Sequence, residues 1–208
     1  VDMVEEIASR LGLQVEWVVA NFDTIFTAVA GNQFDMVAAA STITPEREQT
    51  VDFSAPYFNS RQALVVNTEL TPDLSAYDQL QAGDVVGVQK GTTGAAWAKE
   101  NLVPNGIELQ TFTSATDGLR TLEGGGMTAF IADEPFVAEA TGDLPSLSVV
   151  QGIDTNEVYG FAFSPENPEL TAAVNVTLAE MIADGTYVTI YEKWFPGAPI
   201  PPEFQPAG

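Results

Sequence analysis

The chain contains neither cysteine nor histidine among its 208 residues. Without cysteine there is no disulfide, no thiolate metal ligand and no thiol nucleophile. Without histidine the chain also lacks the side chain that proteins use most often as a general base and as a metal ligand. Chemistry is left to carboxylates, hydroxyls, lysines and the backbone. The composition therefore favours binding over catalysis, and we expect no metal and no cofactor.

Positive charge is scarce as well, because 7 lysines and arginines stand against 29 aspartates and glutamates, giving a formal net charge of −22. Nucleic-acid binding needs a basic surface, so this composition excludes it. The acidity by itself predicts only a well-solvated surface. Hydrophobic residues make up 45% of the chain, which is enough for a core. No apolar run approaches the ~20 residues of a membrane-spanning helix.

Short apolar strands alternate with helical segments along the chain. Residues 2–11 carry apolar side chains at helical spacing and are followed by Gly12, a common helix terminator. Residues 14–19, QVEWVV, are predicted to form a strand. The pattern returns in the middle of the chain, where DVVGVQ, KGTTG and AAWAKEN predict a strand, a tight loop and a helix. This alternation predicts βαβ units and an α/β fold.

Residues 34–58, FDMVAAASTITPEREQTVDFSAPYF, combine a buried strand, a Ser/Thr-rich loop and an arginine. This stretch resembles the signature of the extracytoplasmic solute-binding proteins of polar amino acid ABC transporters. The segments DVVGVQKGTTGAAWA, TAFIADEPFV and DGTYVTIYEKWF follow in the order in which that family carries its motifs. The resemblance to this family, bacterial solute-binding protein family 3, therefore extends along the whole chain.

The resemblance implies a bilobal type II periplasmic-binding-protein fold, with two mostly parallel sheets, flanking helices and a two-strand hinge. Residues 1–60 and 158–208 would form lobe 1, residues 61–157 would form lobe 2, and the ligand would bind between them. The family carries about 28 further residues, including the first strand of lobe 1, before the position of Val1, so the neighbouring strands here would lack a ladder partner.

In lobe 1 the resemblance implies a carboxylate clamp after the strand that ends at Thr42. Arg47 falls on the family's arginine that holds the α-carboxylate of the ligand, and a guanidinium can grip a carboxylate through two parallel hydrogen bonds. Thr42 would add its N–H and hydroxyl, Ala40 would offer its carbonyl to the α-ammonium, and Phe22 would form an aromatic wall. The alternatives are a surface pairing of Arg47 with a neighbouring glutamate, a turn-capping role for Thr42 and a core position for Phe22.

In lobe 2 the resemblance implies that Thr92 and Thr93 present N–H groups and hydroxyls to the same carboxylate at the positive end of a helix. Asp133, which ends a strand, would bind the α-ammonium. As alternatives, such a loop is common before helices, and Asp133 could cap the helix that follows it. Side-chain selectivity is assigned to Ser41, Gln89 and Ala132, together with the wall that the family's upstream residues would form. Because Gln89 is neutral, a neutral polar amino acid is preferred, with basic ligands left open.

The implied function is to bind a free L-amino acid by hinge closure and to deliver it to the membrane permease of an ABC transporter. The expected location is periplasmic or extracellular, with a lipid anchor as an option in an upstream segment. We expect a monomer unless another chain supplies the first strand. Two alternatives stay open, a ligand-sensing module of a receptor and a cyclohexadienyl dehydratase-like enzyme on the same fold. The enzyme would need an acid or base in the cleft without help from histidine or cysteine, so we expect no catalysis.

Overall fold

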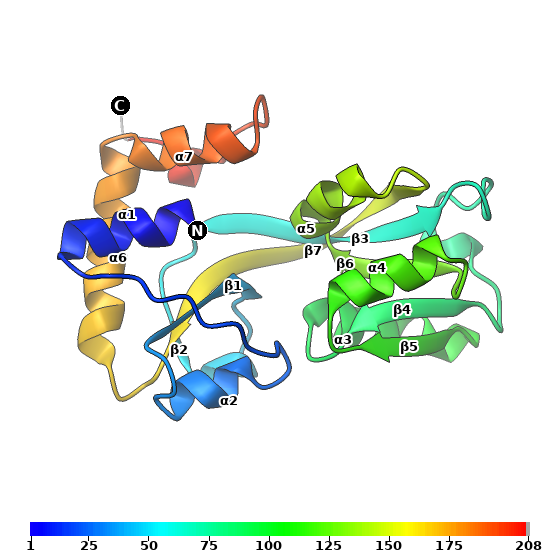
Figure 1. Cartoon of the computed structure of the whole chain (residues 1–208), viewed down its shortest axis with the longest axis horizontal. Coiled ribbons are helices and arrows are strands. Elements are labelled where there is room, and N and C mark those ends of the chain that lie inside the picture. Colours follow the sequence, from blue (N-terminus) through cyan, green and yellow to red (C-terminus); the bar gives the residue numbers. More distant parts are fainter. Residues whose placement is uncertain (207–208) are drawn as a thin grey trace. The chain divides into compact units, whose positions relative to one another are not determined.

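The computed structural model describes residues 1–206, which Figure 1 shows as alternating helices and strands. In this part of the chain, no helix combines the length and the hydropathy of a membrane span. The elements are α1 (Asp2–Leu11), α2 (Ile25–Ala30), β1 (Met36–Thr42), β2 (Asp52–Phe53), β3 (Phe58–Asn67), β4 (Val85–Gln89), α3 (Thr93–Asn101), β5 (Glu108–Phe112), α4 (Ala115–Glu123), β6 (Ala129–Asp133), α5 (Glu134–Ala140), β7 (Leu147–Phe163), α6 (Pro168–Ala183) and α7 (Thr186–Trp194).

The described chain divides into two compact units. Unit 1 comprises Val1–Ala20, Ile25–Asn59 and the chain from Val158 onward. Unit 2 comprises Asn21–Thr24 and Ser60–Glu157. The boundaries fall inside β3 and β7, so each of these long strands contributes residues to both units.

The strands form a mixed sheet with the hydrogen-bonded order β1-β7-β3-β6-β4-β5, and β2 also pairs with β7. In unit 1, β1 and β2 pair with β7 in the antiparallel sense. In unit 2, β4 lies parallel to both β5 and β6, whereas β3 pairs with β6 antiparallel. The α/β prediction is confirmed. The expectation of two mostly parallel sheets is corrected, because the strands form one sheet in which β7 is antiparallel to β1 and β2, and β3 is antiparallel to β6.

Unit 2 has a core on both faces of its strands. Successive residues of β3 alternate between two apolar clusters, with Leu64 in one and Val65 in the other, as expected for side chains of a strand. Helix α3 covers the first face through Ala98, and α4 covers the second through Leu119. Phe130 of β6 is fully buried beneath α4. Strands buried on both faces fix the strand ends at which the candidate site lies.

Unit 1 packs α1 against α6 and α7. Helix α1 has the predicted bounds and presents Val4 and Ile7 to an apolar cluster that includes Leu178 of α6. The helix ends at Gly12, whose φ of 68° lies in the left-handed region that glycine adopts without strain. The apolar spacing in the sequence therefore marks the buried face of this helix correctly.

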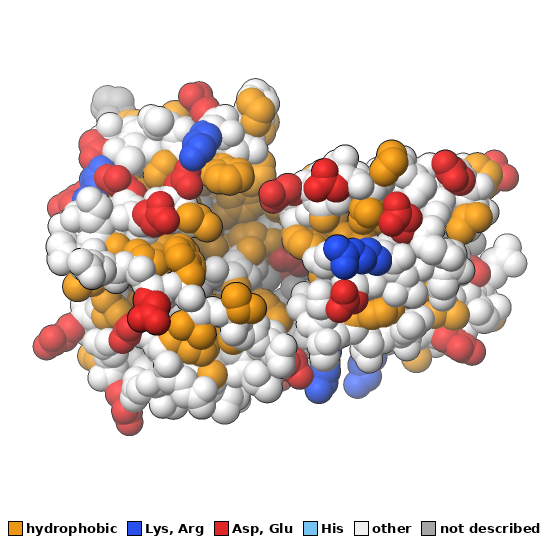
Figure 2. Space-filling model, viewed as in Figure 1, with side chains coloured by type: hydrophobic (Ala, Val, Ile, Leu, Met, Phe, Trp, Pro, Cys, Tyr) orange, Lys and Arg blue, Asp and Glu red, His pale blue; other side chains and the backbone are white. Residues whose placement is uncertain are grey.

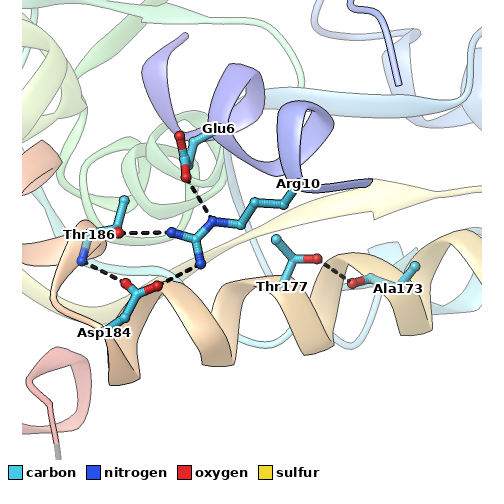
Figure 3. A network of polar contacts seen from close by, with 6 residues as sticks. All are labelled: Glu6, Arg10, Ala173, Thr177, Asp184 and Thr186. Atoms are coloured by element: carbon cyan, nitrogen blue, oxygen red, sulfur yellow. Dashed lines mark hydrogen bonds and ion pairs between the residues drawn. The ribbon is translucent and has the colours of Figure 1, made fainter. Parts of the chain in front are cut away.

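A polar network ties the last turn of α1 to the turn between α6 and α7 (Figure 3). Arg10 donates from Nε to Glu6 at 2.7 Å, from Nη1 to Asp184 at 2.7 Å and from Nη2 to the Thr186 hydroxyl at 2.8 Å. Hydrogen bonds from Arg10 and then from Thr186 lower the pKa of Asp184 to about 2. One arginine thus connects segments that lie more than 170 residues apart in the chain.

The strand expected at residues 14–19 does not form. Residues 13–20 connect α1 to α2 without joining a ladder, and Trp17 and Val19 are 48% and 99% exposed. Together with α1, β1 and α6 they line a cavity of about 640 Å³. Figure 2 shows hydrophobic side chains gathered on this face of unit 1. The β-branched and aromatic residues of this segment suit a strand. A strand also needs hydrogen bonds to a neighbouring strand, and the segment has no such neighbour in the sheet, where β1 pairs with β7 alone.

Candidate functional site

In unit 1 the backbone is distorted where β1 approaches its end. The register between β1 and β7 shifts between Val37 and Ser41. Ala40 lies within this shift and has a φ of 48°, a conformation that costs a residue with a Cβ about 1–3 kcal/mol. The Tyr57 hydroxyl forms a hydrogen bond with the Ala40 backbone. A bulge with a strained residue is common beside ligand sites because it turns backbone groups away from the regular ladder.

The guanidinium of Arg47 is fixed beside this strand end. Its Nη1 donates to the Thr42 carbonyl at 2.7 Å, and its central carbon lies 4.6 Å from the centroid of the Phe26 ring. The Arg47 backbone N–H also donates to the Thr44 hydroxyl at 3.2 Å. A hydrogen bond and an aromatic ring together set the plane of the guanidinium, and a fixed plane is what a bidentate grip on a carboxylate requires.

The aromatic ring beside Arg47 comes from Phe26 of α2, a residue that we did not expect at the site. Phe22, the residue predicted to form the aromatic wall, lies half-buried in the turn at residues 21–24, which groups with unit 2. Phe22 and Phe26 are four residues apart in the sequence. The pairing with Arg47 comes from the tertiary fold, and only the presence of both aromatics in one short segment could have signalled it.

Ser41 and Thr42 lie beneath the surface of unit 1, at 0% and 4% exposure. The Oγ of Ser41 has no hydrogen-bond partner among the described residues. The Ser41 side chain, to which we assigned ligand selectivity, therefore does not reach the surface in this structure. Thr42 contributes the carbonyl that orients Arg47.

In unit 2 the turn at residues 21–24 packs against the loop between β4 and α3. Lys90 Nζ lies 3.0 Å from Asp23 Oδ2. Gly91 has a φ of 80°, and a Cβ at this position would lie 3.0 Å from Asp23 Cα, so the loop needs glycine for both its conformation and its close approach. Phe22 thereby belongs to the same part of unit 2 as the predicted threonines.

Thr92 is the N-cap of α3. Its hydroxyl accepts from the Ala95 N–H at 3.1 Å and donates to the Gln89 carbonyl at 2.8 Å. The hydroxyl proton is therefore used within the loop, and capping is the observed role of this side chain. The Gln89 side chain donates to the Thr113 carbonyl at 3.0 Å. For an anion, α3 offers the N–H groups at its start other than that of Ala95, together with the positive end of its dipole.

Asp133 and Thr93 meet in a polar network with two residues that we did not single out, Gln62 and Glu157. Gln62 Nε2 donates to Asp133 Oδ1 at 2.7 Å, to Glu157 Oε1 at 2.8 Å and to Thr93 Oγ1 at 3.2 Å. Asp133 occupies the N-cap position of α5 but makes no side-chain capping bond there. The network brings together β3, α3, β6 and β7, all within unit 2.

Gln62 and Glu157 are 0% and 7% exposed. A polar residue inside an apolar strand was the available signal, because buried side chains of these types are rare unless they have partners. The partners themselves could not be identified, since they lie 31 to 95 residues away along the chain. Among the described residues no acidic cluster is arranged to hold a metal ion.

Comparison with known proteins identifies the family. Residues 1–197 match the bacterial extracellular solute-binding proteins, family 3. The chain belongs to this family. A family 3 relative, the probable histidine-binding protein of Campylobacter jejuni, is 30% identical over 195 residues, which cover 93% of this chain and 74% of the relative.

Two solved structures extend the comparison. An ancestral arginine-binding protein bound to arginine has a TM-score of 0.85 and 34% identity, covering 93% of this chain and 86% of that protein. The ancestral amino acid-binding protein AncCDT-1, a precursor of cyclohexadienyl dehydratase, has a TM-score of 0.85 and 36% identity, covering 93% and 83%. The type II periplasmic-binding-protein fold is thereby confirmed. The three relatives are named for the amino acids that they bind, and one of them, AncCDT-1, is the precursor of an enzyme.

Proposed function

We propose that the protein binds a free L-amino acid in the periplasm and delivers it to the permease of an ABC transporter. The observation that carries this proposal is the guanidinium of Arg47, fixed between the Thr42 carbonyl and the Phe26 ring. In a chain with a net charge of −22, a preorganised cation beside a strained strand end is suited to bind a carboxylate. The family and the amino acid-binding relatives support the same reading.

Unit 2 would complete the binding of the two charged groups that every free amino acid carries. The first-turn N–H groups of the nine-residue helix α3 would bind the α-carboxylate together with Arg47. Asp133 would bind the α-ammonium. Because no single unit holds all of these groups, the ligand would favour a closed state in which both units contact it. Movement within β3 and β7 would provide the hinge for this closure.

The side-chain class of the ligand is the finer part of the proposal. The neutral side chain of Gln89 favoured a neutral polar amino acid, whereas the relatives named above bind arginine and histidine. Basic amino acids are therefore tested beside neutral polar ones. The acidic side chains that Figure 2 shows on the surface would attract a cationic ligand, although they do not define a pocket.

We propose binding without turnover. AncCDT-1 gives the dehydratase alternative its one specific support, since it is a precursor of such an enzyme. Incubation with prephenate, followed by a search for a dehydrated and decarboxylated product, tests this alternative directly. The receptor-module alternative shares the same binding step, so the binding experiment below applies to it as well.

The test is a thermal-shift screen of the protein against the twenty amino acids, repeated with Arg47→Ala. A ligand at 100 times its Kd stabilises the folded protein by about 2.7 kcal/mol, which gives a clear rise in Tm. Arg120→Ala is the matched control, because it removes the same charge from an exposed position on α4. We expect a stabilising amino acid whose effect is lost in Arg47→Ala and kept in Arg120→Ala. No stabilising amino acid, or one that acts equally on Arg47→Ala, would contradict the proposal.

A further inference from the structure

The proton of the Thr93 hydroxyl has a defined direction because the hydroxyl lies against a buried carboxylate. Thr93 Oγ1 donates to Glu157 Oε2 at 2.8 Å, and the Thr155 hydroxyl donates to Glu157 Oε1 at 2.8 Å. An ionised carboxylate can only accept hydrogen bonds, and a threonine hydroxyl has one proton. The proton of Thr93 therefore points toward Glu157, which is 7% exposed.

The amide of Gln62 leaves the lone pairs of Thr93 only weakly used. Gln62 Nε2 carries two hydrogens but has three acceptors, at 2.7 Å in Asp133, 2.8 Å in Glu157 and 3.2 Å in Thr93. Turning the amide over would place its oxygen against both carboxylates, so this orientation of Gln62 is the favourable one. The two hydrogens serve the two carboxylates best. The Thr93 oxygen, with the longest of the three contacts, keeps its capacity to accept.

The residues of the polar network differ in solvent exposure and form an accessible layer and a buried layer. Thr93 and Asp133 are half-buried, so part of each is accessible to solvent. Gln62 and Glu157 are buried, and they fix the two accessible side chains by hydrogen bonds. The accessible layer therefore presents a carboxylate and a hydroxyl oxygen whose proton is directed inward. Such a surface suits a group with several donors, and an ammonium has three.

We infer that Glu157 is a positioning residue that makes Thr93 an acceptor for the α-ammonium of the ligand, beside Asp133. This inference rests on the proposed function and assigns to Thr93 a role different from the one expected from the sequence. The Thr93 hydroxyl does not donate to the ligand's carboxylate, for which the backbone N–H groups at the start of α3 remain. Glu157 itself acts through Thr93 and Gln62.

The test compares ligands with and without an α-ammonium on wild-type protein and Glu157→Gln. The probes are L-arginine, L-histidine and L-glutamine, each beside its des-amino acid, with Kd measured by calorimetry. The ratio of the two Kd values in a pair measures the preference for the amine. The amide of Glu157→Gln can donate to Thr93 Oγ1 and turn the Thr93 proton outward. We expect the preference to fall by about tenfold or more, the effect of losing a hydrogen bond to a charged group.

Three further variants separate this role from a general structural one. Thr93→Val removes the acceptor and should lower the preference, whereas Thr93→Ser keeps it. Asp84→Asn is the matched control, because Thr128 Oγ1 donates to Asp84 at 3.2 Å in the same unit but outside the site. Asp84→Asn should leave the preference unchanged. If Glu157→Gln does not fold, the contrast between Thr93→Val and Thr93→Ser carries the test.

The outcomes distinguish the inference from the proposed function. Glu157→Gln that weakens both members of a pair equally, or Thr93→Val with an unchanged preference, would overturn the inference and leave amino acid binding intact. Wild-type protein that binds none of the three probes would also overturn it, while the screen of twenty amino acids decides the proposed function separately. A lowered preference in Glu157→Gln and Thr93→Val, with both controls unchanged, supports the inference.

Discussion

Replacing Gly94 with alanine should destabilise the protein through the buried amide of Gln62. Gly94 is the second residue of α3, and a Cβ there would lie 2.5 Å from Gln62 Oε1 and 3.4 Å from Ile131 Cγ2. Gln62 has no exposed surface, so its amide cannot swing into solvent. Relief of the clash requires a movement of about 1 Å, because ordinary contacts need close to 3.4 Å. The movement takes Gln62 Nε2 away from both of its carboxylate partners.

The expected loss follows from the two hydrogen bonds. Each hydrogen bond to a charged group contributes about 1.5–3 kcal/mol, and weakening of two exceeds the gain of about 1 kcal/mol from replacing glycine with alanine in a helix. We expect Gly94→Ala to lower the free energy of unfolding by about 2–5 kcal/mol. Urea unfolding followed by circular dichroism measures the change. Gly142→Ala is the control, because a Cβ there would meet no atom within 4 Å.

A double-mutant cycle tests the mechanism rather than the size of the effect. In a Gln62→Ala background the oxygen that blocks the new methyl group is gone, so Gly94→Ala should become neutral or stabilising by up to about 1 kcal/mol. Equal destabilisation by Gly94→Ala in the presence and in the absence of the Gln62 side chain would refute the reasoning. The destabilisation by Gly94→Ala would then come from the helix backbone and not from the Gln62 amide.

Three further predictions concern stability. Hydrogen bonds from Arg10 lower the pKa of Asp184 to about 2. The ion pair of Asp184 with Arg10 therefore stabilises the fold fully above about pH 4, and this stabilisation is lost as the pH falls toward 2. Asp184→Asn should flatten the fall of Tm across this range, and an unchanged profile would contradict this prediction. Tyr187→Phe removes the hydrogen bond to the Tyr57 carbonyl at 2.7 Å and should cost about 1–3 kcal/mol in urea unfolding, an effect that a value near zero would exclude. Val19→Ser should change the free energy of unfolding by less than about 0.5 kcal/mol, since this side chain is 99% exposed, and a larger loss would reveal burial.

Much of the fold could be predicted because its signals are local. The spacing of apolar residues from Asp2 to Leu11 and the glycine that follows them define α1 correctly. The segment at residues 14–19 shows where local signals fail, because β-branched and aromatic residues do not form a strand without a partner. Arg47 stands out in sequence since cations are scarce, but its contact with Phe26 depends on how α2 packs and has no local signature.

The polar network illustrates the same limit at the candidate site. Asp133 and Thr93 could be placed at element ends, where strand and helix termini are visible in the sequence. Gln62 and Glu157 lie inside β3 and β7, and only the tertiary arrangement of these strands brings them beneath the accessible pair. The direction of the Thr93 hydroxyl proton could not be predicted from the sequence either, because it depends on Glu157, which lies 64 residues later in the chain.

Calorimetric titration of the stabilising amino acid into wild-type protein, Arg47→Lys and Arg47→Ala tests the central claim most directly. Lysine keeps the positive charge but loses the planar pair of donors, which is what the Thr42 carbonyl and the Phe26 ring hold in place. If Arg47 grips the α-carboxylate through two hydrogen bonds, Arg47→Lys should weaken binding by about tenfold or more, and Arg47→Ala should weaken it further. Wild-type affinity in Arg47→Lys would show that only charge is needed, and wild-type affinity in Arg47→Ala would contradict the account.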